Sequence, residues 1–216
     1  MKKTIIIAVV ALLASSMVSS AKSKTLTNFV DKVSSSLVSF DYSFTLQSSK
    51  TRSKMTGSGK VKVQGNAFMM DGNGLEVWCD GATRWTIDRL SEEALVESVD
   101  DSAESYATNP ALMISSVDDA FEEVSFGAST FQGKAADASV LSPIHKGRYS
   151  MDIAGLKLFF KSGTSSLIGA EVTLNDGSVS EFTISDMSFA DLLETKESFR
   201  FDEKTLDDSY VITDLR

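Results

Sequence analysis

Few residues of this sequence could carry out catalysis or hold a metal ion. The 216 residues include one histidine, His145, and one cysteine, Cys79. Sites that need several histidines or several thiolates are therefore excluded, as is a disulfide within the chain. His145 lies beside Lys146 and close to Pro143, and the Gly-x-Ser-x-Gly motif of serine hydrolases does not occur. Cys79 directly follows Trp78 in an apolar run, so we interpret it as a small buried hydrophobic residue.

Adjacent acidic residues are the second feature that could bind a metal ion. The pairs are Glu92-Glu93, Asp100-Asp101, Asp118-Asp119 and Glu122-Glu123. Neighbouring acids lack the alternating ligand spacing of a calcium loop and are typical of a solvated face. The 21 Lys and Arg and 30 Asp and Glu residues give a formal net charge of −9. This balance argues against a nucleic-acid partner, because phosphate contacts need clustered basic side chains. We expect no catalytic residues, no metal and no cofactor.

The first 21 residues have the pattern of a signal peptide. Lys2 and Lys3 precede an apolar stretch from Thr4 to Leu13, and Ser19 and Ala21 stand at the −3 and −1 positions of a cleavage site after Ala21. The apolar stretch is short for a permanent membrane anchor, which is the alternative interpretation. We therefore expect a signal peptide at 1–21 and a single domain at 22–216 that is exported to the periplasm.

The residues after the signal peptide predict one helix and then a series of strands. Apolar residues from Leu26 to Leu37 follow the spacing of one helix face. From Ser39 onward, apolar and polar residues alternate, which predicts half-buried strands. Tight turns are indicated at Asp80-Gly81 and Asp176-Gly177, because Asx-Gly pairs supply the positive φ angles of antiparallel hairpins.

Short helices interrupt this pattern in two places. Asn109-Pro110 reads as the N-cap and first residue of a short helix, and a second short helix or turn is predicted at 189–193. A further strand is predicted at 199–202. The fold class expected from the pattern is mainly β, an antiparallel domain with a few short helices.

The most distinctive feature is a large apolar set on the predicted strands. One interpretation is an ordinary β core; the other is a curved sheet that encloses a cavity for an apolar ligand, closed by a helix. Gly57 and Gly59 on an apolar face would leave room or let the strand bend. We expect a cavity of this kind to be lined by Phe40, Tyr42, Phe44, Leu46, Met55, Val61, Val63, Phe68, Met70, Val77, Trp85, Ile87, Leu112 and Met113.

Four parts of the sequence form a further pattern: Gly57-x-Gly59-x-Val61-x-Val63, Phe68, the segment from Asp80-Gly81 to Trp85, and the last six residues, Val211–Arg216. In these parts the sequence resembles the periplasmic outer-membrane lipoprotein carrier family, LolA. The resemblance covers nearly the whole chain after residue 21. Carriers from proteobacteria have an Arg-Pro pair where this chain has Gln64-Gly65-Asn66, so the lid-closing role of that Arg cannot be transferred. In this respect the sequence looks like the branch found in Bacteroidetes-type bacteria.

The resemblance implies a curved, incompletely closed antiparallel β-barrel capped by short helices. It implies a non-enzymatic, monomeric carrier whose cavity holds the acyl chains of lipoproteins. The implied partners are an inner-membrane ABC-type lipoprotein exporter as donor, and an outer-membrane receptor or the membrane itself as acceptor. Two alternatives remain open: a binding module of the same fold for another lipid or glycolipid, and an enzyme that acts on envelope material.

Overall fold

The computed structural model describes residues 22–72, 74–99, 109–144, 153–193 and 195–216. The predicted signal peptide, His145 and the pair Asp100-Asp101 lie outside the described residues.

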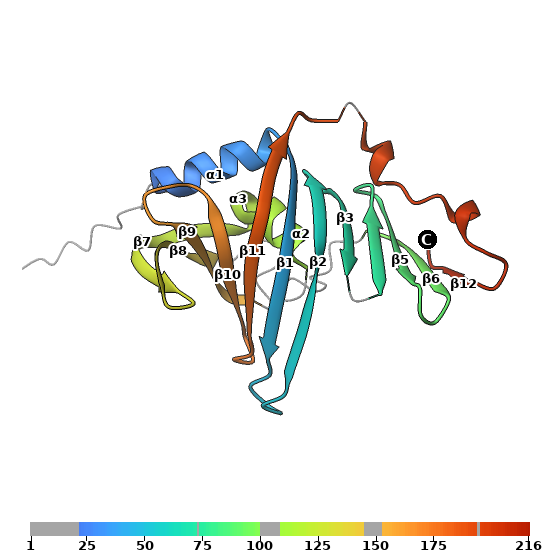
Figure 1. The fold of residues 1–216 in the computed structure, drawn as a ribbon, viewed down its shortest axis with the longest axis horizontal. Helices are drawn as coiled ribbons and strands as arrows, with labels where there is room; N and C mark the ends of the chain where they lie inside the picture. The colour runs from blue at the N-terminus through green and yellow to red at the C-terminus, as the bar shows by residue number, and fades with distance from the viewer. Residues whose placement is uncertain (1–21, 73, 100–108, 145–152, 194) are drawn as a thin grey trace, which may run out of the picture.

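The described residues form one sheet of twelve strands (Figure 1). The strands are β1 Leu37–Gln47, β2 Lys54–Gln64, β3 Ala67–Gly72, β4 Leu75–Cys79, β5 Thr83–Asp88, β6 Glu93–Ser98, β7 Phe121–Phe131, β8 Lys134–Pro143, β9 Ile153–Lys161, β10 Leu167–Leu174, β11 Val179–Ala190 and β12 Val211–Asp214. The sheet is open, with β12 and β7 at its two edges, and only the β12–β6 pair is parallel. The predicted fold class, mainly β with an N-terminal helix and short helices, is confirmed.

The strand order divides the sheet into two meanders, in which each strand pairs with its neighbours in the sequence. The first meander runs from β1 to β6 and the second from β7 to β11. They meet where β1 pairs with β11, over ten residue pairs from Leu37↔Ala190 to Gln47↔Val179. The predicted turns at Asp80-Gly81 and Asp176-Gly177 are present, and both glycines have positive φ.

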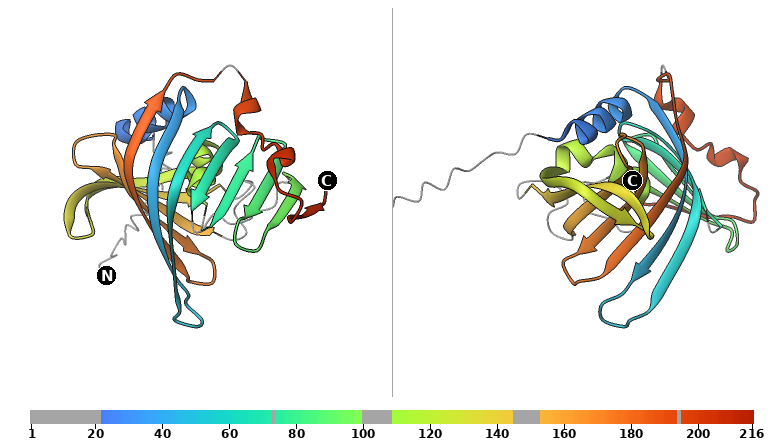
Figure 2. Two further views of the ribbon diagram at one scale, coloured as in Figure 1. Left: turned by 45° about the vertical axis from the view of Figure 1, so that its right-hand side comes forward. Right: turned by 60° about the vertical axis from the view of Figure 1, so that its left-hand side comes forward.

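Three helices pack against one face of the curved sheet (Figure 2). They are α1 Lys24–Ser34, α2 Pro110–Ser115 and α3 Val117–Ala120. The predicted helix start at Asn109 is confirmed, because its side chain accepts hydrogen bonds from the backbone N–H groups of Ala111 and Leu112. α1 begins after Ser23, and the backbone N–H and the hydroxyl group of Ser23 both donate to the buried carboxylate of Glu123 in β7. These contacts fix the first turn of α1 to the edge of the second meander.

Two predictions about the C-terminal part of the chain were wrong. No helix forms at 189–193, because β11 continues to Ala190 in its ladder with β1. No strand forms at 199–202; instead the short 3-10 helices η1 Lys196–Phe199 and η2 Glu203–Thr205 flank this segment. The backbone at Arg200 and Asp202 is extended, as the alternating Phe199 and Phe201 predict, but no strand pairs with it.

Candidate ligand-binding site

The register of the strands decides which side chains share a face of the sheet. In antiparallel pairs, directly opposite residues point to the same side. One row of opposite residues crosses seven strands: Gly57, Phe44, Phe182, Ala170, Leu158, Ser139 and Phe126. This row lies on the face that the three helices cover, which we call the concave face.

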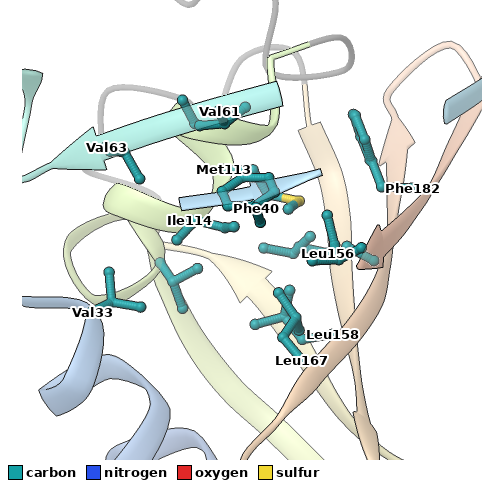
Figure 3. Close-up of a cluster of buried hydrophobic side chains, with 14 of the residues drawn as sticks. Val33, Phe40, Val61, Val63, Met113, Ile114, Leu156, Leu158, Leu167 and Phe182 are labelled. Carbon is teal, nitrogen blue, oxygen red and sulfur yellow. The ribbon is translucent and has the colours of Figure 1, made fainter. Parts of the chain in front are cut away.

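The concave face and the helices enclose a single hydrophobic cluster, which we call the concave core. α1 contributes Leu26, Phe29 and Val33, and α2 contributes Met113 and Ile114. The remaining members come from strands of both meanders, as Figure 3 shows for Val61, Leu156 and Phe182. The concave core therefore joins the two meanders and the three helices.

Most of the predicted lining residues belong to the concave core. Its buried members include Phe40, Tyr42, Phe44, Val61, Val63, Phe68, Val77 and Met113. Leu46, Met70 and Leu112 are partly buried and pack against it. Met55 lies opposite Leu46 near the end of the β1–β2 hairpin and is 47% exposed. Several core side chains, such as Phe40 at 2% and Met113 at 0%, have almost no accessible surface, so a ligand beside them requires the helices to move.

Trp85 and Ile87 correct the expectation that the predicted lining residues on the strands all lie on one face of the sheet. Val77 pairs with Thr86, so Trp85 and Ile87 on either side of Thr86 point to the opposite, convex face. There they form a separate cluster with Ala94, Val96 and Phe201, which we call the C-terminal cluster. The sequence did contain a signal for this. A hairpin loop of two or four residues after Cys79 pairs the odd-numbered residues of β4 with even-numbered residues of β5. Val77 therefore shares a face with the even-numbered residues of β5 and not with Trp85 or Ile87.

Sequence reasoning missed the contribution of the second meander and of α1. Leu156, Leu158 and Phe160 alternate on β9, and their side chains are buried in the concave core. The ring of Phe160 meets that of Phe29 of α1 edge-to-face, with centroids 5.6 Å apart. The alternation of β9 and the apolar stripe of α1 were visible in the sequence, but their common destination depends on the β1–β11 pairing.

A cleft of about 270 Å³ lies at the surface beside the concave core. It lies between α1, the loop that joins β9 to β10, and the end of β11. Its lining residues are Asn28, Lys32, Ser165, Ser166, Leu167, Met187 and Phe189. Leu167 is itself a buried member of the concave core, and Met187 and Phe189 pack against that core. The cleft thus has polar groups at its rim and the concave core at its floor.

Burial also perturbs one titratable group at the concave core. The pKa of Tyr42 is raised, first because burial disfavours the phenolate and second because Asp71 carries a nearby negative charge. Cys79 is buried, with its sulfur 3.7 Å from the backbone oxygen of Asn66.

Among the described residues, no group of three or more His, Cys, Asp or Glu could hold a metal ion. In the same part of the chain, no helix has the length and hydrophobicity needed to cross a membrane.

No protein-family model matches the sequence, and no curated protein matches it. The structure is similar to several solved structures at low sequence identity. A DUF1329 family protein from Desulfovibrio piger is 11% identical, with a TM-score of 0.48 over 85% of this chain and 96% of that one. A LolA superfamily protein from Nitrosomonas europaea is 12% identical, with a TM-score of 0.45 over 82% and 97%. A putative outer membrane lipoprotein-sorting protein domain from Vibrio parahaemolyticus is 12% identical, with a TM-score of 0.40 over 79% and 92%.

Proposed function

We propose that the protein is a non-enzymatic carrier that binds the acyl chains of lipoproteins in the concave core. The observation that supports this most directly is the cleft whose floor, at Leu167, is part of that core. A surface opening that borders a large apolar interior gives an acyl chain a point of entry when the helices move. Each CH₂ group that leaves water contributes about 0.8 kcal/mol, so a long chain gains on the order of 10 kcal/mol in such an environment.

Binding requires the helices over the concave face to move, and their size favours such movement. α2 has six residues and α3 has four, and helices this short have little stability of their own. Their position therefore depends on packing of residues such as Met113 and Ile114 against the sheet. An acyl chain that takes over these apolar contacts replaces them at little cost.

In the proposed cycle, residues 1–21 are removed and residues 22–216 act in the periplasm. An inner-membrane ABC-type exporter loads the lipoprotein, and an outer-membrane receptor or the membrane itself accepts it. Transfer requires no catalysis, because it is a competition between apolar sites of different affinity. The net charge of −9, which becomes −11 when Lys2 and Lys3 are removed, disfavours adhesion to anionic membrane surfaces.

Two neighbouring methionines of β3 provide a matched test of the proposed site. Met70 pairs with Val61 on the concave face, whereas Met69 is opposite Trp78 on the convex face, and both are half-buried. We expect Met70→Lys to reduce binding of a palmitoylated lipopeptide by at least about tenfold, because it puts an ammonium group where the chain lies. Met69→Lys should leave binding within about twofold of the unaltered protein.

The measurement is displacement of a fluorescent hydrophobic probe by the lipopeptide, with circular dichroism as the check that both variants fold. Equal binding by folded Met70→Lys and Met69→Lys proteins would place the ligand elsewhere. Absence of any lipopeptide binding to the unaltered protein would overturn the proposed function.

A binding module for another lipid or glycolipid is the second candidate. The polar rim of the cleft favours it, because Lys32, Asn28 and Ser165 are suited to a polar head group. Mass spectrometry of gently purified protein distinguishes the two candidates. Co-purified lipoprotein supports the carrier, and free lipid without lipoprotein supports the binding module.

A further inference from the structure

We infer that the cleft beside α1 recognises the anionic head group, a carboxylate or phosphate, of an acyl-chain amphiphile, with Lys32 as the charged contact. The inference rests on the acyl-chain site of the proposed function and deepens its second candidate, a binding module for another lipid, since it assigns the polar end of the ligand. The cleft is divided into two kinds of surface. Asn28, Lys32, Ser165 and Ser166 supply polar groups, while Leu167, Met187 and Phe189 supply the apolar side.

The charge of this cleft is opposite to that of the molecule as a whole. The chain has nine more acidic than basic residues, yet the lining contains one lysine and no carboxylate. Lys32 makes no ion pair with any carboxylate in the described part of the chain. Its ammonium group instead lies 4.1 Å from the centroid of the Phe189 ring. A cation–π contact of this kind holds the ammonium over the cleft and leaves its N–H groups for an anion.

Other donors of the cleft are also available for a ligand. Within the described residues, the side chains of Asn28 and Ser165 make no hydrogen bond. Asn28 and Lys32 are four residues apart, so they lie on the same side of α1, and Ser165 faces them from the β9–β10 loop. An amide, a hydroxyl and an ammonium group around one opening suit an oxygen-rich anionic group.

The position of the floor gives the ligand its direction. Leu167 lies at the start of β10, opposite Phe160, and both are buried in the concave core. A head group held at Lys32 therefore places the start of its acyl chain at the edge of that core. The combination selects an amphiphile, since an isolated phosphate gains nothing from the floor and an uncharged chain gains nothing from Lys32.

Two lipids that differ only in a phosphate test the inference. 1-Palmitoyl-glycerol and 1-palmitoyl-lysophosphatidate share the acyl chain and the glycerol. Palmitate, the free fatty acid with the same chain, is the third ligand and carries a carboxylate in place of the phosphate. We expect the unaltered protein to bind both anionic lipids about two- to fivefold more tightly than palmitoyl-glycerol, the range of an exposed ion pair. Lys32→Ala should remove this preference while it leaves palmitoyl-glycerol binding unchanged, and Lys32→Arg should retain most of it.

The matched control is Lys24→Ala, which removes an exposed lysine from the first turn of α1, outside the cleft. The Lys24→Ala variant should keep the full preference for the anionic lipids. In the unaltered protein and in this variant, 0.5 M salt should weaken that preference. The inference is overturned if the unaltered protein binds all three lipids equally, if Lys32→Ala keeps the preference, or if inorganic phosphate alone competes as well as lysophosphatidate. These outcomes leave palmitoyl-glycerol binding intact and so differ from failure of the proposed function, in which none of the lipids binds.

Discussion

At the scale of single residues, Gly59 shows that a glycine on an apolar face can serve close packing. We expected Gly57 and Gly59 to leave room beneath the ligand or to let β2 bend. A Cβ atom at Gly59 would overlap the backbone oxygen of Asp71 and come within 2.9 Å of the Cα of Gly72. The two strands therefore touch through their backbones here, with no space for a side chain.

Gly59→Ala is accordingly expected to destabilise the protein by about 1–3 kcal/mol, because neither backbone can move without disturbing its ladder. Gly127→Ala is the control, since a Cβ at Gly127, on the edge strand β7, meets no atom within 4 Å. It should change stability by less than about 0.5 kcal/mol. Urea unfolding of both variants gives the measurement, and similar midpoints would contradict the close approach at Gly59.

At the scale of elements, the C-terminal segment acts as a cover for the convex side of the first meander. It contributes Phe201, with Leu206 and Tyr210 packed at the edge, to the C-terminal cluster. The indole N–H of Trp85 donates to Glu203 at 2.9 Å, and β12 adds itself to the edge of the sheet beside β6. This cover occupies the face opposite the concave core, so it does not contact the proposed ligand.

The first meander and its cover should lose stability at acidic pH. Hydrogen bonds from Arg216 lower the pKa of Asp214 to about 2, and hydrogen bonds from Arg89, which also reaches Tyr210, lower that of Glu76. Because both folded pKa values are depressed, the stabilisation is present above pH 5 and is lost as the pH falls toward 2.

Both tryptophans of the protein, Trp78 and Trp85, lie at this cover, so their fluorescence reports on it selectively. We expect the fluorescence to change between pH 5 and pH 2.5. Arg89→Gln, which removes the partner of Glu76, should make the change smaller. Constant fluorescence over this range in the unaltered protein would contradict the expectation.

At the scale of the whole molecule, local signals in the sequence were enough to predict the elements, but the site also depends on how distant elements meet. The cap at Asn109, the Asx-Gly turns and the alternation of β1 and β2 each involve a few neighbouring residues. They therefore led to the correct fold class and to the part of the concave core that the first meander and α2 supply. The cleft combines α1, the β9–β10 loop and β11, which are far apart in the sequence, and no local pattern indicates their meeting. The error at Trp85 and Ile87 had a different cause. Alternation shows that a strand has two faces, but only its pairing with neighbouring strands shows which face lies toward the concave core.

The division into two meanders has a consequence for how the chain folds. Within each meander, strands pair with sequence neighbours, so little chain entropy is lost when each pair forms. The β1–β11 pairing is different: Phe44 and Phe182, whose ring centroids are 5.6 Å apart, are separated by 138 residues along the chain. We expect the two meanders to form early and the joining of β1 to β11 to set the folding rate.

Stopped-flow refolding distinguishes this order from others. Phe182→Leu, at the junction, and Ile87→Val, inside the first meander, should both mainly slow refolding, because the contacts of both residues are present when the two meanders join. If Phe182→Leu mainly accelerated unfolding instead, the junction would form after the rate-limiting step. Because the concave core takes residues from both meanders, a chain in which β1 and β11 have not yet paired has no complete acyl-chain site. The protein would then become able to bind its ligand in the same step that completes its fold.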